Sequence, residues 1–529
     1  MAEVNNRQPG LDNRPRVWTI AGSDSSGGTG IQADLATLSD LECHACCVIT
    51  AQSSVTVAAV EAVSATMLIV QLDTLAADLK PAAIKIGLLA DQAQINLLAT
   101  WLASALAQWK SAGVVVPVIL DPGMVATCGD TLTKGSTLDF SPFKALLTLI
   151  TPNVSELAIL AGRQLLTATD SVQAAIGLSH ALATSVLAKG GDRGPVWQHD
   201  KAVDLLVCHQ VDGISSLHQN QSFWLSSTRV DSGNNHGTGC ILSSAIAAVM
   251  AQSFVLNDAV VVAKAYVSQG LLHRYQSGNG VGCLAHCGWP NDLASYPIIE
   301  QLAASLNAPP TNDKQVYTFK KIAEPLGVYP VVAEIDLLQQ LLRAGASTIQ
   351  LRVKDGNDPL LEQKIVQAIG LGRDYSAKVF INDHWQLAIK HQAYGVHLGQ
   401  EDLVESNLQL LSEVNVALGL SSHSYFEILL AKQHNPSYIA FGHIFPTTTK
   451  QMPSAPQGLN KLARYVELMQ GVLPIVAIGG IDASNLAAVK ASGVDDVAVV
   501  RAVTDADAPA TAYQTLVAEW VLGASYGAD

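Results

Sequence analysis

The chain has 529 residues, which is too long for one ordinary hydrophobic core and indicates two or three domains. Hydrophobic residues make up 49% of the chain and charged residues only 14%, which excludes a disordered protein and indicates a folded globular one. The net charge of −14 argues against broad affinity for nucleic acid or for an anionic membrane surface. We therefore expect small-molecule partners, and an anionic substrate would need a local cluster of cations, N–H groups or metal ions.

The chain carries no feature of an exported or membrane protein. Its first 16 residues are polar and lack the apolar core of a secretory signal, and no apolar run approaches a membrane span. The eight cysteines are scattered, which suits reduced thiols, and the Cys43-x-x-Cys46 and Cys283-x-x-x-Cys287 spacings lack the second half of a convincing zinc site. We expect a cytoplasmic protein.

The first half opens with a β-like run at 17–21, followed by the Gly/Ser-rich loop 22–30 and a helical stretch from Ile31. This order predicts a ligand-binding turn at the carboxyl end of a strand. Strand-like runs also lead into the polar segments 121–124, 151–156 and 189–192. Their recurrence predicts an open α/β domain whose site lies along one edge of a parallel sheet.

The stretch Asn234–Cys240, Asn-Asn-His-Gly-Thr-Gly-Cys, runs directly into an apolar helical segment. The first N–H groups of a helix have no partner within the helix, and the helix dipole favours negative charge there. Glycines let an anion approach the backbone closely. The stretch therefore predicts an anion hole, although a turn followed by a buried cysteine is the simpler alternative.

These segments together resemble the hydroxymethylpyrimidine/phosphomethylpyrimidine kinases, over roughly residues 15–290. The motifs that match are Ala21–Gly28, Thr151-Pro152-Asn153-x-x-Glu156, Lys189-Gly190-Gly191 and His236–Cys240. The resemblance implies a ribokinase-like α/β sandwich. It also implies that ATP and Mg²⁺ are used to phosphorylate 4-amino-5-hydroxymethyl-2-methylpyrimidine twice.

The same resemblance implies roles for particular residues. Cys240 would act as the base at the substrate oxygen, and Lys189 would contact nucleotide phosphate. Asn153 and Glu156 would lie near the phosphates and Mg²⁺, and Asp34 would hydrogen-bond the pyrimidine. The anion hole for the transferring phosphoryl group would be formed by Gly237, Thr238, Gly239 and Cys240.

Two positions depart from the family pattern in the pyrimidine pocket. Val55 would line this pocket where the family usually has a glutamine that reads the ring, and Leu88 stands where it has a methionine. The second change is mild, whereas the first alters recognition. Val55 therefore keeps open an alternative, a pyridoxal-type or other small-molecule kinase.

The region 291–325 reads as a linker. It contains Pro309-Pro310 followed by Thr-Asn-Asp, which are turn formers. Within it, residues 298–306 are compatible with a short helix.

The second half contains eight β-like runs separated mostly by helix-compatible stretches, which predicts a (β/α)₈ TIM barrel. The runs lie at 329–332, 348–351, 379–381, 395–398, 417–420, 438–441, 475–478 and 496–500. Polar or Gly-rich residues follow nearly every run, at the end of the barrel where active sites form.

These residues predict a charge pattern at that end. Arg352, Lys354 and Lys450 are cations suited to phosphate groups. Asp383 and Asp402 offer the hard oxygen ligands that Mg²⁺ prefers. The glycines 479–480 follow the seventh run, where barrels often hold a phosphate. The sequence thus predicts a Mg²⁺-pyrophosphate site facing a monophosphate site.

The second half resembles thiamine-phosphate synthase over roughly residues 326–525. The motifs that match are Gln350-Leu351-Arg352-x-Lys354, 381–383, 395–402, Ile444–Thr447-x-Thr449-Lys450 and 477–481. In that family a pyrimidine pyrophosphate loses pyrophosphate, and the nitrogen of a thiazole phosphate captures the resulting cation. Catalysis then consists of stabilising a leaving group and a cation.

The resemblance implies the following roles. Asp383 and Asp402 would hold Mg²⁺, and Ser421 would lie near the pyrimidine. The pyrophosphate would be bound by Gln350, Arg352, Lys354, Asn382 and Lys450. The thiazole phosphate would be held by Thr447, Thr449 and the amides of Gly479 and Gly480.

We therefore expect a bifunctional thiamine-biosynthesis enzyme in which the product of the kinase half is the substrate of the synthase half. Val331–Glu334 and Arg501 depart from the synthase pattern, which leaves a weakly active or regulatory barrel as the alternative. Because related kinases and synthases are often oligomeric, a homodimer is the first assembly to test.

Overall fold

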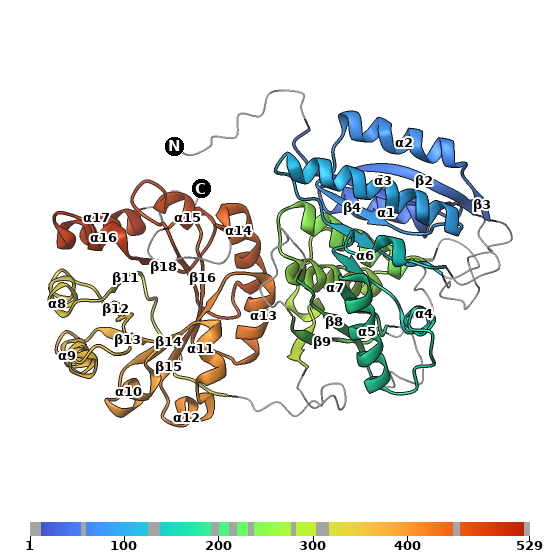
Figure 1. Ribbon diagram of the computed structural model, residues 1–529. Helices are drawn as coiled ribbons and strands as arrows, with labels where there is room; N and C mark the ends of the chain where they lie inside the picture. Colours follow the sequence, from blue (N-terminus) through green and yellow to red (C-terminus); the bar gives the residue numbers. More distant parts are fainter. Residues whose placement is uncertain are drawn as a thin grey trace. The chain divides into compact units, whose positions relative to one another are not determined.

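The computed structural model describes residues 12–53, 60–124, 138–191, 200–210, 220–230, 237–276, 282–302, 317–447 and 455–522. The chain divides into two compact units, Met1–Asn312 and Asp313–Asp529 (Figure 1). No helix in these ranges is both long enough and apolar enough to span a bilayer.

The first unit is built on one large sheet. Its described strands lie in the order β10-β9-β8-β7-β6-β5-β4-β1-β2-β3, with β3 and β8–β10 antiparallel and the others parallel. The strands are β1 (Arg16–Asp24), β2 (His44–Ser53), β3 (Val60–Ala62), β4 (Ala83–Ile86), β5 (Val118–Leu120), β6 (Leu149–Ile150), β7 (Ser185–Ala188), β8 (Lys201–Val207), β9 (Ser222–Thr228) and β10 (Ile298–Gln301).

Helices cover both faces of this sheet (Figure 1). They are α1 (Gly30–Asp40), α2 (Ala65–Asp78), α3 (Gln92–Ser111), α4 (Val154–Leu160), α5 (Ala168–Leu182), α6 (Thr238–Ala251) and α7 (Leu256–Leu272), with short 3₁₀ turns η1 (Ser141–Phe143) and η2 (Leu293–Ser295). Alternation along β1 explains the layering: Trp18 and Ile20 point into the core shared with α2 and α3, whereas Thr19 faces α1 on the other side.

Helix α6 is the central helix of the first unit. All eleven residues from Ile241 to Ala251 are buried, because the segment is apolar on every side and is packed against α1, α7, β1 and β4. This packing fixes the N-terminus of α6 close to the carboxyl ends of the parallel strands, where the polar segments of the sequence were expected to meet.

The helix expected at 298–306 was wrong for its first four residues, which form strand β10. Residues Ile298–Gln301 pair antiparallel with β9, and Leu302 N–H continues this pairing by donating to the Ser222 carbonyl. The sheet of the first unit therefore extends into the range predicted as a linker. The segment Ile298-Ile299-Glu300-Gln301 fits either element locally, and pairing with a strand distant in sequence decides the outcome.

The second unit is a closed barrel of eight parallel strands in sequential order, which confirms the predicted TIM barrel. The strands are β11 (Val328–Val332), β12 (Thr348–Leu351), β13 (Lys378–Asn382), β14 (Gly395–Leu398), β15 (Ala417–Ser422), β16 (Tyr438–Phe441), β17 (Ile475–Ile478) and β18 (Asp496–Val499). The surrounding helices are α8 (Ile335–Arg343), α9 (Leu361–Asp374), α10 (Trp385–Lys390), α11 (Gln400–Glu405), α12 (Leu408–Glu413), α13 (Tyr425–Gln433), α14 (Gly458–Met469), α15 (Leu486–Ala491), α16 (Arg501–Thr504) and α17 (Pro509–Leu522).

Large and small residues interlock inside the barrel. Phe380 and Tyr438 fill space that Gly395 and Gly419 leave open. A Cβ at Gly395 would lie 2.3 Å from Phe380 Cε1, and one at Gly419 would lie 2.2 Å from Tyr438 Cζ. The interior is therefore a packed core, and chemistry is left to the carboxyl end of the strands.

Candidate active sites

The start of α6 forms a backbone cradle in the first unit. Gly237, the N-cap, adopts a left-handed φ of 83°, and a Cβ there would lie 2.0 Å from the Gly28 carbonyl oxygen. The glycine loop after β1 and the start of α6 are therefore in direct contact. Thr238, Gly239 and Cys240 form the first turn of the helix, whose N–H groups are those that a helix leaves without internal partners. This geometry suits an anion.

Lys189 and Asp121 face this turn. Lys189 Nζ lies 2.7 Å from Asp121 Oδ1, which also accepts a hydrogen bond from the Thr151 hydroxyl. A Cβ at Gly239 would lie 3.1 Å from Lys189 Nζ and 3.3 Å from Asp121 Oδ2. The three polar residues follow the neighbouring strands β5, β6 and β7, so the sheet brings them together at one edge.

Asn153 and Glu156 form the capping box of α4. Asn153 Oδ1 accepts from the Glu156 N–H, and Glu156 accepts from the backbone N–H groups of Asn153 and Met124. Burial raises the pKa of Glu156, and the nearby negative charge of Asp121 raises it further. Two carboxyl groups, those of Asp121 and Glu156, therefore lie near the cradle.

Hydrogen bonds from neighbouring residues fix the loop that carries Lys189. The Gly190 N–H donates to Asp204 Oδ1, while Lys264 Nζ lies 2.6 Å from Asp204 Oδ2. Arg229 donates to the Gly191 carbonyl at 2.6 Å. Sequence reasoning missed Asp204, Arg229 and Lys264, because their signal is a contact between distant strands and not a local motif.

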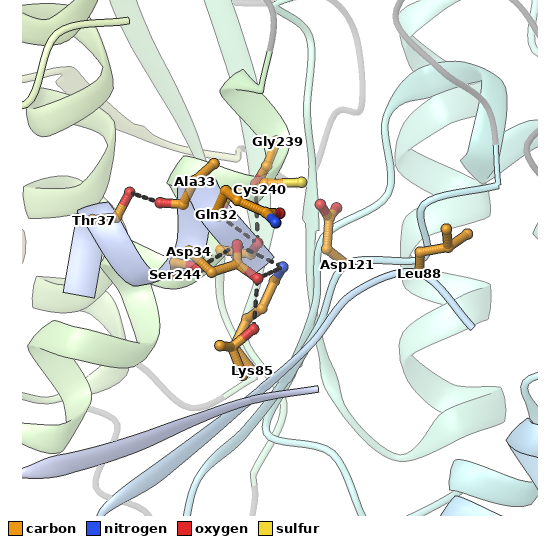
Figure 2. A network of polar contacts seen from close by, with 12 residues as sticks. Gln32, Ala33, Asp34, Thr37, Lys85, Leu88, Asp121, Gly239, Cys240 and Ser244 are labelled. Carbon is orange, nitrogen blue, oxygen red and sulfur yellow. Dashed lines mark hydrogen bonds and ion pairs between the residues drawn. The ribbon is translucent and has the colours of Figure 1, made fainter. Parts of the chain in front are cut away.

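Asp34 lies in a fully buried network in the same unit (Figure 2). Its oxygens accept from Lys85 Nζ at 2.7 and 2.9 Å, from the Thr19 hydroxyl at 2.5 Å and from the Ser244 hydroxyl at 2.8 Å. These four contacts match the acceptor capacity of a carboxylate. A pyrimidine would have to displace one of these donors to bind Asp34, so the expected role of Asp34 stays a prediction.

Cys240 lies within the electrostatic reach of this network. Burial raises the pKa of Cys240 to about 11, although the positive charge of Lys85 and a hydrogen bond from the Gly30 N–H act in the opposite direction. The thiol is thus protonated at neutral pH. Leu88, the residue in the methionine position, is partly buried and packs on Gly22.

The barrel brings Asp383 and Asp402 together. Asp383 follows β13 with a left-handed φ of 64°, and Asp402 lies in α11 after β14. Burial, followed by the adjacent carboxylate of Asp402, raises the pKa of Asp383 to about 6. Two carboxyl groups that meet in this way supply oxygen ligands of the kind Mg²⁺ prefers.

Arg352 lies beside these carboxyl groups. Its backbone N–H donates to the Val332 carbonyl. Its positive charge offsets part of the rise in the pKa of Asp383 and adds to the effect of burial in lowering the pKa of His397. Gln350 and Asn382 are buried at the ends of β12 and β13. Lys354 is exposed in the segment that follows β12.

Ser421 lies at the end of β15 in a chain of polar contacts. Its hydroxyl contacts His397 Nε2 at 2.8 Å, and His397 Nδ1 contacts the Tyr438 hydroxyl at 2.8 Å. Burial lowers the pKa of His397 to about 4, so its ring is neutral at physiological pH. Gln400 donates to the Ser421 carbonyl.

Gly479 and Gly480 follow β17 with φ values of 102° and 67°. A Cβ at Gly479 would lie 2.5 Å from His443 Cβ, and one at Gly480 would lie 2.7 Å from the Pro446 carbonyl oxygen. The glycine pair is therefore packed against residues 443–446, which directly precede Thr447. Only glycine combines this backbone conformation with such a close approach.

Several expected site residues lie outside the described part of the chain: Val55, His236, Thr449 and Lys450. Of the positions that depart from the synthase pattern, Val331 and Val332 are buried in β11. Glu334 is exposed at the N-cap of α8, and its carboxylate lies 3.6 Å from Lys364 Nζ. Arg501 begins α16 and is exposed.

Comparisons with known proteins divide the chain between residues 285 and 328, a range that includes the boundary between the two compact units. Residues 24–285 match the phosphomethylpyrimidine kinase family, and residues 328–503 match the thiamine monophosphate synthase family. The thiamine-phosphate synthase of Pectobacterium atrosepticum is 53% identical over 188 residues, which are 36% of this chain and 88% of that protein. The thiamine-phosphate synthase of Escherichia coli O157:H7 is 54% identical over 188 residues, with 36% and 89% covered.

Solved structures similar to the first half include a phosphomethylpyrimidine kinase from Clostridium difficile, at 28% identity and a TM-score of 0.38. It is matched over 48% of this chain and 98% of that chain. A pyridoxal kinase from Staphylococcus aureus is 26% identical with a TM-score of 0.44, over 54% and 98% of the two chains. From the two family matches and the synthase relatives, the chain belongs to the phosphomethylpyrimidine kinase family through its first half and to the thiamine-phosphate synthase family through its second.

Proposed function

We propose that this chain carries out consecutive steps of thiamine biosynthesis. The first unit phosphorylates hydroxymethylpyrimidine twice with ATP, and the second joins the resulting pyrimidine pyrophosphate to a thiazole phosphate. The observation that carries this proposal is that one chain combines an anion cradle facing a lysine with a barrel end that bears paired carboxyl groups beside an arginine.

In the kinase half, the N–H groups of the first turn of α6 receive the transferring phosphoryl group, and Lys189 neutralises phosphate charge. In its thiolate form, which is the minor form at neutral pH, Cys240 takes the proton of the attacking hydroxyl. Such transfer depends mainly on positioning and charge stabilisation, which preorganised N–H donors and a fixed lysine provide. Asp121 and Glu156 have the oxygen donors to hold Mg²⁺, which when bound would offset the phosphate charge.

In the synthase half, Arg352 and Lys354 stabilise the departing pyrophosphate, and Ser421 orients the pyrimidine. Asp383 and Asp402 fit Mg²⁺ because their carboxyl groups meet at the barrel end, and the metal when bound would neutralise pyrophosphate charge. The amides of Gly479 and Gly480, with Thr447, hold the thiazole phosphate. Bond cleavage then needs charge stabilisation and no protein nucleophile.

One reaction followed by mass spectrometry tests the proposal. It contains the purified chain, hydroxymethylpyrimidine, ATP, Mg²⁺ and thiazole phosphate, and we expect thiamine phosphate to form. Pyrimidine pyrophosphate accumulating alone would contradict the assignment of the barrel. Absence of any phosphorylated pyrimidine would contradict that of the kinase half, and pyridoxal offered in competition would then reveal a different substrate.

Two variants assign each step to its unit. Cys240→Ala should lower phosphorylation by about 100-fold, the scale of losing one group that acts in the transition state, and leave coupling of supplied pyrimidine pyrophosphate unchanged. Asp383→Asn should have the opposite pattern. Loss of both activities in either variant, while the protein stays folded by circular dichroism, would show that the sites are not independent.

A further inference from the structure

The Asp34–Lys85 ion pair is buried at the point where four elements of the first unit meet. Both side chains are 0% exposed. Asp34 comes from α1 and Lys85 from β4, while the hydroxyl donors to Asp34 come from Thr19 on β1 and Ser244 on α6. The pair thus joins the two helices that begin at the glycine loops.

The pair lies directly beneath the phosphate cradle. Ser244 is one helical turn after Cys240, so both side chains lie on the same face of α6. The Gly30 N–H at the start of α1 hydrogen-bonds to the Cys240 sulfur. Figure 2 shows the Lys85 ammonium beside Asp34, on the side that faces Cys240 and Asp121.

Fold stability alone does not call for this pair. The other residues of β4, Ala83, Ile84 and Ile86, are apolar and fully buried. Replacing a buried ion pair by apolar groups of similar volume is often neutral or stabilising. Burial is the largest single effect on Lys85 and disfavours its charged form, but the attraction of Asp34, Cys240 and Asp121 together outweighs it and raises the pKa of Lys85. The ammonium charge is therefore maintained next to the cradle.

We propose that Lys85 is a positioning residue of phosphoryl transfer: through Asp34 and Ser244 it holds the starts of α1 and α6 together, and it supplies a buried positive charge beneath the Cys240 thiol. This role rests on the proposed kinase function and adds to it a residue that touches neither ATP nor pyrimidine. It also gives a reason why the acceptor sites of Asp34 are filled within the protein.

The first test compares Lys85→Met with the double variant Asp34→Asn/Lys85→Met. The single variant leaves a buried carboxylate without its cation, and we expect a lower Tm and a kcat about 100-fold below wild type. In the double variant, the introduced asparagine keeps partners in Thr19 and Ser244, and the introduced methionine fills the aliphatic volume of the lysine, so Tm should recover. We expect kcat to stay at least about tenfold low, with KM for both substrates nearly unchanged.

A purely structural role predicts the opposite result for the double variant, because kcat would recover together with Tm. That recovery would overturn the proposal. Synthase turnover with supplied pyrimidine pyrophosphate serves as the internal control for protein quality in all three proteins.

The second test needs no kinase activity. Cys240 is alkylated with iodoacetamide at pH 9, and its rate is compared with that of exposed Cys47 in the same molecule. Lys85, Asp34 and Asp121 are the charged groups that act on this thiol. Losing Lys85 should slow alkylation of Cys240 by about tenfold, as expected for one unit of thiol pKa, without affecting Cys47. An unchanged ratio would overturn the proposed charge effect, whereas failure of the wild-type protein to phosphorylate hydroxymethylpyrimidine would refute only the kinase assignment.

Discussion

Cys240 gives the kinase half a distinctive dependence on pH. Its pKa is raised to about 11 by burial, so the thiolate fraction grows with pH throughout the range from 7 to 9. If the thiolate is the base, kcat for phosphorylation should rise by about tenfold per pH unit over this range. The measurement is single-turnover phosphorylation at saturating ATP and Mg²⁺, with Cys240→Ala as the control. A flat profile in the wild-type protein would rule out the thiolate as the base.

Asp383 predicts a different dependence for the synthase half. Because burial and Asp402 raise its pKa to about 6, the carboxylate becomes protonated as the pH falls through that value. Protons then compete with Mg²⁺, so coupling should decline below about pH 6, and more Mg²⁺ should move the midpoint of this decline to lower pH. Initial rates at low and at saturating Mg²⁺ measure the shift. A midpoint that does not change with Mg²⁺ concentration would show that Asp383 does not bind the metal.

At the scale of the elements, the start of α6 is where backbone geometry and chemistry coincide. Gly239 lies in the first turn of α6 and is not among the glycines with a positive φ, and alanine is favoured over glycine in helices by up to about 1 kcal/mol, so Gly239→Ala should fold. Its methyl group would stand 3.1 Å from Lys189 Nζ and 3.3 Å from Asp121 Oδ2, in the space assigned to the phosphoryl group. We expect phosphorylation to fall by about 100-fold with no loss of Tm.

The matched control for this variant is Gly177→Ala in α5. A Cβ at Gly177 meets nothing within 4 Å, so this variant gains the same helical preference without blocking a site. It should keep wild-type kinase activity. If Gly239→Ala were as active as Gly177→Ala, the anion would have to bind somewhere other than the first turn of α6.

The elements also show how far sequence alone leads. All eight barrel strands were predictable, because each is a β-like run and nearly every run is followed by polar or glycine residues at one end of the barrel. Strand β10 was not, since Ile298–Gln301 is a strand only through its pairing with β9. The Asp34–Lys85 pair was equally hidden: a lysine within an apolar strand does not reveal a partner 51 residues away. Local motifs thus predicted the polar residues at the carboxyl ends of the strands. The buried residues that pack beneath them, such as Asp34 and Lys85, are brought together only by tertiary contacts.

At the scale of the whole molecule, each unit has a hydrophobic core of its own. The core around Trp18, Leu98 and Val186 lies within the first unit, and the core around Tyr329, Phe380 and Tyr438 lies within the barrel. A domain with its own core can in principle fold alone. The product of the kinase half is a small molecule that diffuses freely, so co-expression at equal dose is sufficient to explain the fusion, and tethering raises local concentration only modestly.

Cutting the chain near residue 312 tests this view. We expect the two halves, expressed separately, to be soluble and to unfold cooperatively, because neither loses a part of its core. Mixed at equal concentration with hydroxymethylpyrimidine, ATP, Mg²⁺ and thiazole phosphate, they should form thiamine phosphate at the rate of the intact chain. A slower mixture, with each half fully active on its own substrate, would show that the fusion transfers the pyrimidine pyrophosphate between sites. Insolubility of both halves would instead show that the two units share a core.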